Sequence, residues 1–307
     1  EQDAIDYCLF MQAADDARHE DAAAFADIAR GETEVPVPSW IIPKPPPRKR
    51  HEILHPAKFP ETLVQHFIDL FTVPGQTVLD PMVGTGSAVV ASLKSGRSAY
   101  GVELSSQWAK IAKRRVAAEL EGHLFAHSTD DLEGCIIQSD AYDIDSLDEL
   151  RGKRFNYVIT SPPYWSMLQN RGSEYQRGRR HRNLSTVYST DEHDIGNIQD
   201  YEVFVEMLQS IYEKVAILLE PKSILTIIVK NVKRQHTIYP LAWDIVSSLC
   251  RESGPYEYVG NTFWCQDDVG LKPFAVGTHW VSNTLHQYCL HLRRKSKHEG
   301  GSSRRMS

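Results

Sequence analysis

The sequence has few cysteines, no long apolar run and no large charge of one sign. Its five cysteines among 307 residues are an odd number at wide spacings, and none forms a Cys-x-x-Cys or Cys/His pair. We therefore expect reduced thiols and no bound metal. No apolar run reaches about 18 residues, so no membrane-spanning helix and no membrane partner are expected. The cysteines are Cys8, Cys135, Cys250, Cys265 and Cys289.

The net charge is weak and unevenly distributed along the chain. The sequence carries 34 Lys and Arg against 40 Asp and Glu, a formal charge of −6, which argues against a generally basic coat for nucleic acid. Much of the acid lies in residues 1–34, an Ala-rich stretch expected to contain helix. Residues 1–7 lack the basic and apolar regions of a signal peptide. A cytoplasmic location is expected, in a prokaryotic cytosol, or a nuclear one if the source is eukaryotic.

Three parts of the chain differ in composition. Residues 1–50 combine the acidic segment with a proline-rich linker, residues 51–295 alternate between apolar strand and helix patterns, and residues 296–307 form a polar tail. Strands separated by helices predict an α/β fold with a doubly wound, mostly parallel sheet, ending in a late antiparallel hairpin. Strands are expected at 77–80, 99–104, 135–138, 157–160, 224–230, 256–265 and 287–293, and helices at 61–71, 87–95, 107–121, 201–219 and 239–250.

A glycine-rich turn joins the first of these strands to a helix. Gly84 and Gly86 follow Asp80 and allow the backbone to approach a ligand at a helix N-terminus. Glu103, at the end of the next strand, is placed to hold two ribose hydroxyls. A phosphate-binding P-loop is excluded because no Gly-Lys-Ser/Thr follows, and a dinucleotide fingerprint fits less well because Val89 replaces the third glycine. An adenosyl cofactor without pyrophosphate fits best, although a plain strand-to-helix turn remains open.

Polar residues also follow the third and fourth strands. Asp140 is placed to accept a hydrogen bond from an adenine amino group, or else to cap a helix. The fourth strand ends in Ser161-Pro162-Pro163-Tyr164-Trp165. Prolines remove two backbone donors, so a carbonyl and the serine hydroxyl can accept hydrogens from an exocyclic amine. The two aromatic rings offer flat faces for a base, the alternative being that both are core residues.

These motifs together resemble those of the S-adenosylmethionine-dependent DNA amino-methyltransferases over residues 53–295. The turn from Asp80 to Gly86 resembles the cofactor motif, the segment from Ser161 to Trp165 the catalytic motif, and residues 55–60 the motif that closes over the methionine moiety. The resemblance implies a Rossmann-like, seven-stranded methyltransferase sheet. It implies cofactor contacts at His55, Pro56, Lys58, Phe59, Pro60, Asp80, Pro81, Gly84, Gly86, Glu103, Leu104, Asp140 and Ala141.

The resemblance also implies a reaction and partners. Ser-Pro-Pro-Tyr motifs usually accompany methylation of cytosine N4 in a flipped base of double-stranded DNA, with a cognate restriction endonuclease as a further partner. No cysteine follows a proline, which disfavours methylation at cytosine C5. The cofactor turn precedes the catalytic motif, so the order is permuted relative to many relatives with this motif. Residues 166–197 and 266–285 are expected to be DNA-recognition loops. Contacts with DNA are expected from Arg171, Arg177, Arg179, Arg180 and Arg182 in the first loop, and from Lys233 and Arg234 after the fifth strand.

Other functions remain open at this stage. Adenine N6 is the alternative target, and the same chemistry serves exocyclic amines in RNA. A protein-glutamine methyltransferase usually has Asn at the position of Ser161. A non-catalytic nucleic-acid-binding module and a nicotinamide oxidoreductase are the remaining classes.

Overall fold

A computed structural model describes residues 37–42, 59–125, 132–163, 165, 193–234, 237–265 and 285–296. The expected segments 1–36, 166–192 and 266–284 lie outside these residues, as does most of the linker and of the tail. Within the described part, no helix is both long enough and apolar enough to cross a membrane.

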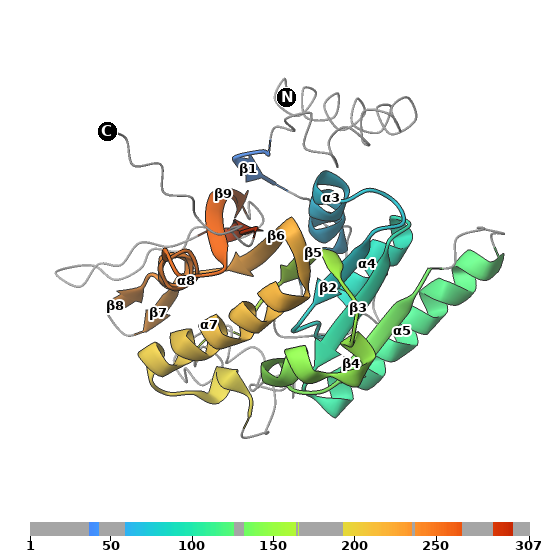
Figure 1. The fold of residues 1–307 in the computed structure, drawn as a ribbon, viewed down its shortest axis with the longest axis horizontal. Coiled ribbons are helices and arrows are strands. Elements are labelled where there is room, and N and C mark those ends of the chain that lie inside the picture. Colours follow the sequence, from blue (N-terminus) through green and yellow to red (C-terminus); the bar gives the residue numbers. More distant parts are fainter. Residues whose placement is uncertain are drawn as a thin grey trace, which may run out of the picture.

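A single large sheet forms the centre of the described fold (Figure 1). Its strand order is β1-β9-β10-β6-β5-β2-β3-β4. The strands from β4 to β6 pair in parallel, and β10 runs antiparallel to both β6 and β9. The predicted parallel sheet with a late antiparallel hairpin is confirmed. The strands span Trp40–Ile41 (β1), Thr77–Asp80 (β2), Ser98–Glu103 (β3), Gly134–Gln138 (β4), Phe155–Thr160 (β5), Leu219–Val229 (β6), Tyr256–Cys265 (β9) and His286–Arg294 (β10).

Helices cover both faces of the sheet, as the doubly wound prediction requires. Strand residues alternate between the faces: Val78 packs with one hydrophobic cluster and Leu79 with the other. One cluster joins the sheet to α3 (Glu61–Phe71), α4 (Ser87–Lys94) and α5 (Ser106–Phe125). The other joins it to α7 (Tyr201–Leu218), α8 (Leu241–Leu249) and the short helix η1 (Ala141–Ser146). Among the described residues, the other 3-10 turns are η2 (Asp148–Leu150) and η4 (Ile195–Asn197).

Several local predictions differ from the structure. Within the described residues, the central sheet has eight strands rather than the predicted seven, and β6 begins at Leu219 rather than at Ile224. The helix expected at 239–250 begins at Leu241, because Pro240 forces Tyr239 toward an extended conformation and Tyr239 joins β8 (Thr237–Tyr239). That strand pairs with β7 (Val232–Arg234) in a separate hairpin, which the sequence pattern did not indicate. The proline-rich linker contributes β1, a two-residue edge strand parallel to β9, where proline is tolerated.

The buried His291 joins the β9–β10 hairpin, strands β5 and β6 and the proline-rich linker through one chain of hydrogen bonds. Tyr157 OH lies 2.8 Å from Thr226 Oγ1, which lies 3.0 Å from His291 Nδ1. Thr262 Oγ1 lies 3.1 Å from His291 Nε2 and donates to the carbonyl of Pro38 at 2.7 Å. Since Thr262 gives its hydrogen to Pro38, it accepts from Nε2–H, and Nδ1 accepts from Thr226. His291 is therefore neutral and held in one tautomer.

This network predicts a pH-dependent contribution to stability. Burial lowers the pKa of His291 from 6.5 to about 3, and the nearby His66 acts in the same direction. The unfolded chain takes up this proton below pH 6.5, whereas the folded chain does so only near pH 3. Relative to a His291→Gln variant, the wild-type free energy of unfolding should therefore fall as the pH is lowered through this range, by at most about 1.4 kcal/mol per pH unit. Urea unfolding of both proteins at several pH values measures it; a constant difference would contradict the prediction.

Candidate functional site

A pocket of about 890 Å³, counted with its open mouth, lies at the carboxyl ends of β2, β3, β4 and β5. Ligands bind at this edge in open α/β sheets. The pocket brings together residues that the sequence places in three separate motifs. Of the predicted cofactor and catalytic residues, those that line it are Phe59, Pro81, Gly84, Glu103, Leu104, Asp140, Ala141, Ser161, Pro162 and Pro163.

The two glycines of the turn have different roles. Both have positive φ, 55° at Gly84 and 84° at Gly86, a conformation that L side chains rarely adopt. Gly84 lines the pocket, as expected. Gly86 does not: a Cβ there would lie 3.1 Å from the Cβ of Ala112 on α5. Gly86 therefore lets α4 begin tightly against α5, and its proximity to the ligand stays a prediction.

Glu103 joins the turn to the end of β3. Its Oε2 accepts a hydrogen bond from the backbone N–H of Gly84 at 2.9 Å, and its Oε1 accepts one from Ser105 at 2.8 Å. A carboxylate has about four acceptor positions, so two remain for ligand hydroxyls. Burial raises the pKa of Glu103 to about 7, the two N–H donors oppose that rise, and the charges of Asp80 and Asp194 add to it.

Asp80 lies behind the pocket wall rather than on it. The residue is 1% exposed, and its Oδ1 accepts from the N–H of Met82 at 3.0 Å. Burial raises its pKa to about 7, and the bond from Met82 lowers it. Asp80 thus holds the turn through its bond with Met82. Its negative charge, together with that of Glu103, would attract a positively charged ligand in the pocket.

Asp140 combines both roles that the sequence left open. Its Oδ1 accepts from the N–H of Tyr142 at 2.8 Å, which caps η1, while the residue also lines the pocket. The cap fixes the carboxylate at the pocket edge, where its remaining acceptor positions can meet a ligand amine.

The catalytic segment is split between the pocket and the core. Ser161, Pro162 and Pro163 line the pocket, and Tyr164 lies outside the described residues. Trp165 is 2% exposed, with ring centroids 5.0 Å from Tyr201 and 4.7 Å from Tyr239. The prediction that Trp165 offers a face to a base is wrong, because its side chain is buried and packs against the rings of Tyr201 and Tyr239.

Part of the pocket wall comes from residues to which the sequence assigns no site role. Trp108 on α5 lines the pocket, and so do His193, Asp194 and Ile195. Asp194 is 6% exposed, and its Oδ1 accepts from the N–H of Gly196 at 2.9 Å, capping η4. The signal was an Asp-x-Gly cap before a helix, which indicates a local turn but not which ligand it faces. In the described residues, no three His, Cys, Asp or Glu side chains gather to hold a metal ion.

The remaining predicted site residues fall into two groups. Pro60 precedes α3 as its N-cap residue, and Lys233 and Arg234 lie on β7. The others lie outside the described residues and stay predictions: His55, Pro56, Lys58, Arg171, Arg177, Arg179, Arg180 and Arg182.

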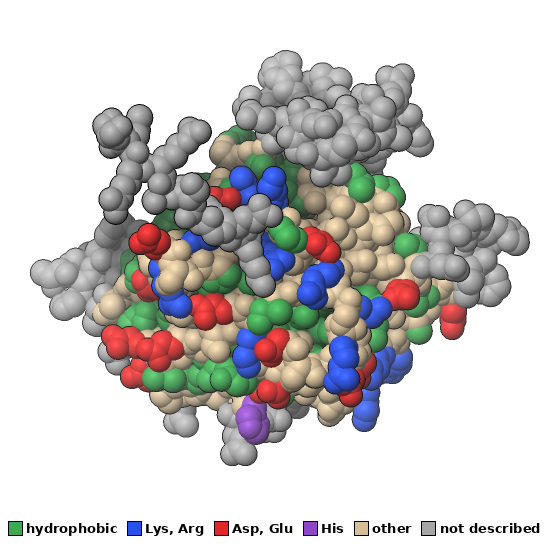
Figure 2. Space-filling model, in the orientation of Figure 1, with side chains coloured by type: hydrophobic (Ala, Val, Ile, Leu, Met, Phe, Trp, Pro, Cys, Tyr) green, Lys and Arg blue, Asp and Glu red, His purple; other side chains and the backbone are tan. Residues whose placement is uncertain are grey.

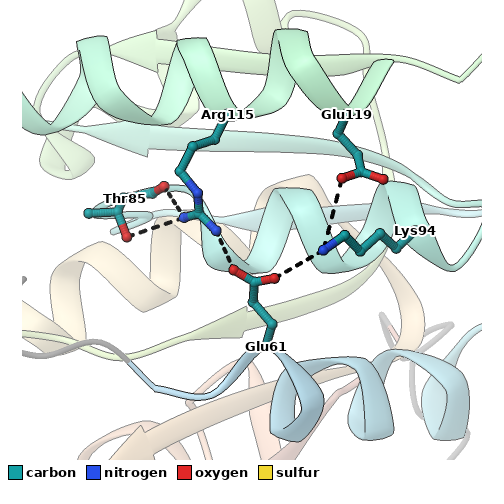
Figure 3. Close-up of polar contacts among 5 residues, drawn as sticks. All are labelled: Glu61, Thr85, Lys94, Arg115 and Glu119. Atoms are coloured by element: carbon teal, nitrogen blue, oxygen red, sulfur yellow. Dashed lines mark hydrogen bonds and ion pairs between the residues drawn. The ribbon is translucent and has the colours of Figure 1, made fainter. Parts of the chain in front are cut away.

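An arginine on α5 holds the cofactor turn in place (Figure 3). Arg115 donates to the carbonyl of Thr85 in the turn and to the carboxylate of Glu61, the first residue of α3. Lys94 Nζ forms ion pairs with Glu61 Oε2 at 3.2 Å and with Glu119 Oε2 at 3.9 Å. Thr85 lines the pocket, as does Phe59 two residues before Glu61. Arg115 therefore ties both of these pocket walls to α5.

This arrangement predicts a specific loss of ligand affinity. Replacing Arg115 with Met removes a charged donor to the turn, a loss of about 1.5–3 kcal/mol, so the Kd for S-adenosylmethionine should rise about tenfold or more. Arg114→Met is the matched control, because Arg114 is exposed one position away and, among the described residues, donates to the Lys110 carbonyl of its own helix. Calorimetric titration of both variants measures it; equal affinities would contradict the role.

The comparisons with known proteins agree with the motifs. The DNA methylase family profile matches residues 12–114, about a third of the chain. YubD of Escherichia coli strain K12, whose name describes a methylase, is 45% identical over 64 residues, 21% of this chain and 28% of YubD. The type II methyltransferase M2.DpnII of Streptococcus pneumoniae is 37% identical over 67 residues, 22% of this chain and 25% of that protein.

The chain thus matches only about a quarter of the length of these curated relatives. Magnesium protoporphyrin IX methyltransferase of Synechocystis PCC 6803, solved with bound SAM, has a TM-score of 0.42 at 12% identity, over 76% of this chain and 79% of that one. That likeness is too low to carry an argument. The family profile covers the turn and Glu103, and over residues 12–114 the chain is similar to the DNA methylase family.

Proposed function

We propose that the chain transfers a methyl group from S-adenosylmethionine to the exocyclic amine of a DNA base, with cytosine N4 as the target. One observation carries the proposal: Ser161, Pro162 and Pro163 share a single pocket with Gly84 and Glu103. Residues of the motifs that resemble the family's cofactor and catalytic motifs therefore line one pocket.

The pocket residues fit an adenosyl cofactor with a positive centre. Glu103 has acceptor positions for the ribose hydroxyls, and Asp140 has them for the adenine amine. Trp108 and Phe59 supply apolar wall, and the buried carboxyls of Asp80 and Glu103 favour a cation. Bound there, the cofactor supplies an electrophilic methyl group on a sulfonium.

The catalytic segment then handles the hydrogens of the amine. Ser161 Oγ and the Pro162 carbonyl would each accept one amine hydrogen, which favours a pyramidal nitrogen with an available lone pair. As that pair forms the N–C bond, the C–S bond breaks with its electrons on sulfur, and the amine loses one proton to solvent. Orientation and electrostatics supply the catalysis, with no covalent enzyme intermediate.

The choice of cytosine N4 depends on Ser161. In the resemblance, Ser at this position accompanies N4 methylation, whereas Asp accompanies N6 methylation of adenine. Adenine in DNA and an amine in RNA remain the alternatives, since the pocket chemistry serves any exocyclic amine.

Double-stranded DNA is the proposed partner, and a restriction endonuclease of matching specificity is a second one. Lys233 and Arg234 on β7, together with Lys230 directly after β6, put positive charge at the edge of the sheet that holds Ser161. Over the described part of the face that α7 occupies, acidic and basic side chains are interspersed without a broad basic area (Figure 2). DNA is therefore proposed to bind at the carboxyl edge, with the arginines of residues 171–182 as further phosphate contacts.

The direct test is methylation of DNA followed by nucleoside mass spectrometry, which separates N4-methylcytosine from N6-methyladenine. Parallel incubation with RNA decides between the nucleic acids. Ser161→Ala should lower the rate at least about tenfold, since it removes one acceptor from the amine, and should leave the Kd for S-adenosylmethionine unchanged. Methylation by the variant at the wild-type rate would contradict the assignment of Ser161.

The buried acids predict a pH dependence of cofactor binding. The pKa values of Asp80 and Glu103 both lie at about 7, so both groups gain negative charge as the pH rises through neutrality. S-adenosylmethionine, with its sulfonium, should bind several-fold tighter at about pH 8 than at about pH 6, and neutral-sulfur S-adenosylhomocysteine should gain less. Calorimetry at constant ionic strength measures the ratio. Asp80→Asn should reduce the rise, and identical pH profiles for both ligands would rule out this electrostatic role.

A further inference from the structure

We propose that Arg234 is a positioning residue that couples a DNA phosphate on the β7–β8 hairpin to the catalytic segment through the ring of Trp165. The inference rests on the proposed function and names a role for a residue that lies outside the pocket. Its basis is the contact between one charged side chain and the end of the motif that holds the amine.

Trp165 is held by rings. Its centroid lies 5.0 Å from that of Tyr201 at 64°, and 4.7 Å from that of Tyr239 at 62°, both edge-to-face contacts. Tyr201 and Tyr239 also contact each other at 4.7 Å. The buried Nε1 of Trp165 has no hydrogen-bond partner among the described residues. Within that part of the chain, packing contacts rather than a hydrogen bond of its own set where this side chain lies.

Arg234 completes the surroundings of the ring. Its Cζ lies 4.9 Å from the centroid of the Trp165 ring, within the range of a cation–π contact. A guanidinium is planar, so a face that stacks on an aromatic ring leaves the N–H donors at its edge for a phosphate. One side chain can thus contact the catalytic segment and the DNA backbone at once.

The hairpin connects this contact to the rest of the fold. Arg234 pairs with Thr237, and β8 ends at Tyr239, which contacts Trp165. Tyr201 begins α7 and donates its hydroxyl to Asp244 on α8 at 2.5 Å. Two sides of the Trp165 ring therefore depend on the β7–β8 hairpin, and the third on a tyrosine tied to α8.

The chemistry gives this arrangement a consequence. Ser161 and Trp165 bracket the two prolines, so a shift of the Trp165 ring moves the segment whose oxygens accept the amine hydrogens. A misplacement of about 1 Å from a distant change can cost on the order of 100-fold in rate. A phosphate bound to Arg234 fixes the guanidinium over the ring, and productive alignment then depends on DNA in register on the hairpin.

The test compares kcat at saturating DNA and cofactor with the separate affinities for both. Arg234→Met should lower kcat at least about tenfold and weaken DNA binding, with the Kd for S-adenosylmethionine within about twofold of wild type. Arg234→Lys keeps the charge without the planar face, so it should restore most of the DNA affinity and little of kcat. Arg154→Met is the control, since Arg154 is exposed at the opposite, amino end of β5 and should leave every parameter unchanged.

The possible outcomes distinguish failure of the Arg234 coupling from failure of the proposed methyltransferase function. If Arg234→Met loses DNA affinity but keeps the wild-type kcat at saturation, Arg234 is a phosphate contact only, and the coupling is overturned. If Arg234→Met loses cofactor affinity and thermal stability together, the role is structural, and the coupling is again overturned. If the wild-type chain transfers no methyl group to any nucleic acid, the proposed function fails first and the coupling with it.

Discussion

The carboxylate of Glu103 is the contact on which the site depends most. One side chain at the end of β3 accepts the backbone N–H of Gly84 in the turn after β2 and that of Ser105 before α5. The same carboxylate therefore links two strand ends to two helix beginnings. It adds to the backbone bond from Val83 N–H to the Val102 carbonyl, 2.9 Å long, which also holds the turn against β3.

Burying the negative charge of Glu103 next to Asp80 costs free energy of folding. This cost suggests that the two acids serve ligand binding rather than stability. Asp80 is buried and Glu103 is partly buried near it, and desolvation raises the pKa of each to about 7. A pair of buried acids without a cation is an unfavourable arrangement for stability alone. A positive ligand in the pocket would offset that cost, so these acids favour a charged ligand over a neutral one.

Local sequence patterns predict the strands, the helices and the glycine-rich turn. Contacts between segments far apart in the sequence, which such patterns do not show, determine the rest of the site. The strand at 256–265 and the helix at 61–71 match the structure residue for residue, because apolar periodicity depends only on neighbours in sequence. Arg115 and Glu61 are 54 positions apart, and no periodicity links them. Trp165 was misjudged for the same reason, since nothing local shows that the start of α7 and the end of β8 would enclose it.

The order of motifs along the chain matters less to the chemistry than the order of strands in the sheet. The cofactor turn follows β2 and the catalytic segment follows β5, and these two strands are hydrogen-bonded neighbours, with Val78 opposite Tyr157. Any connection that keeps them adjacent and parallel brings Gly84 and Ser161 to one edge. What the order does set is which segments leave that edge. Here β6, the next strand after Ser161, leads into β7, so one short hairpin carries both Arg234, which contacts Trp165, and Lys233, which is proposed to contact DNA.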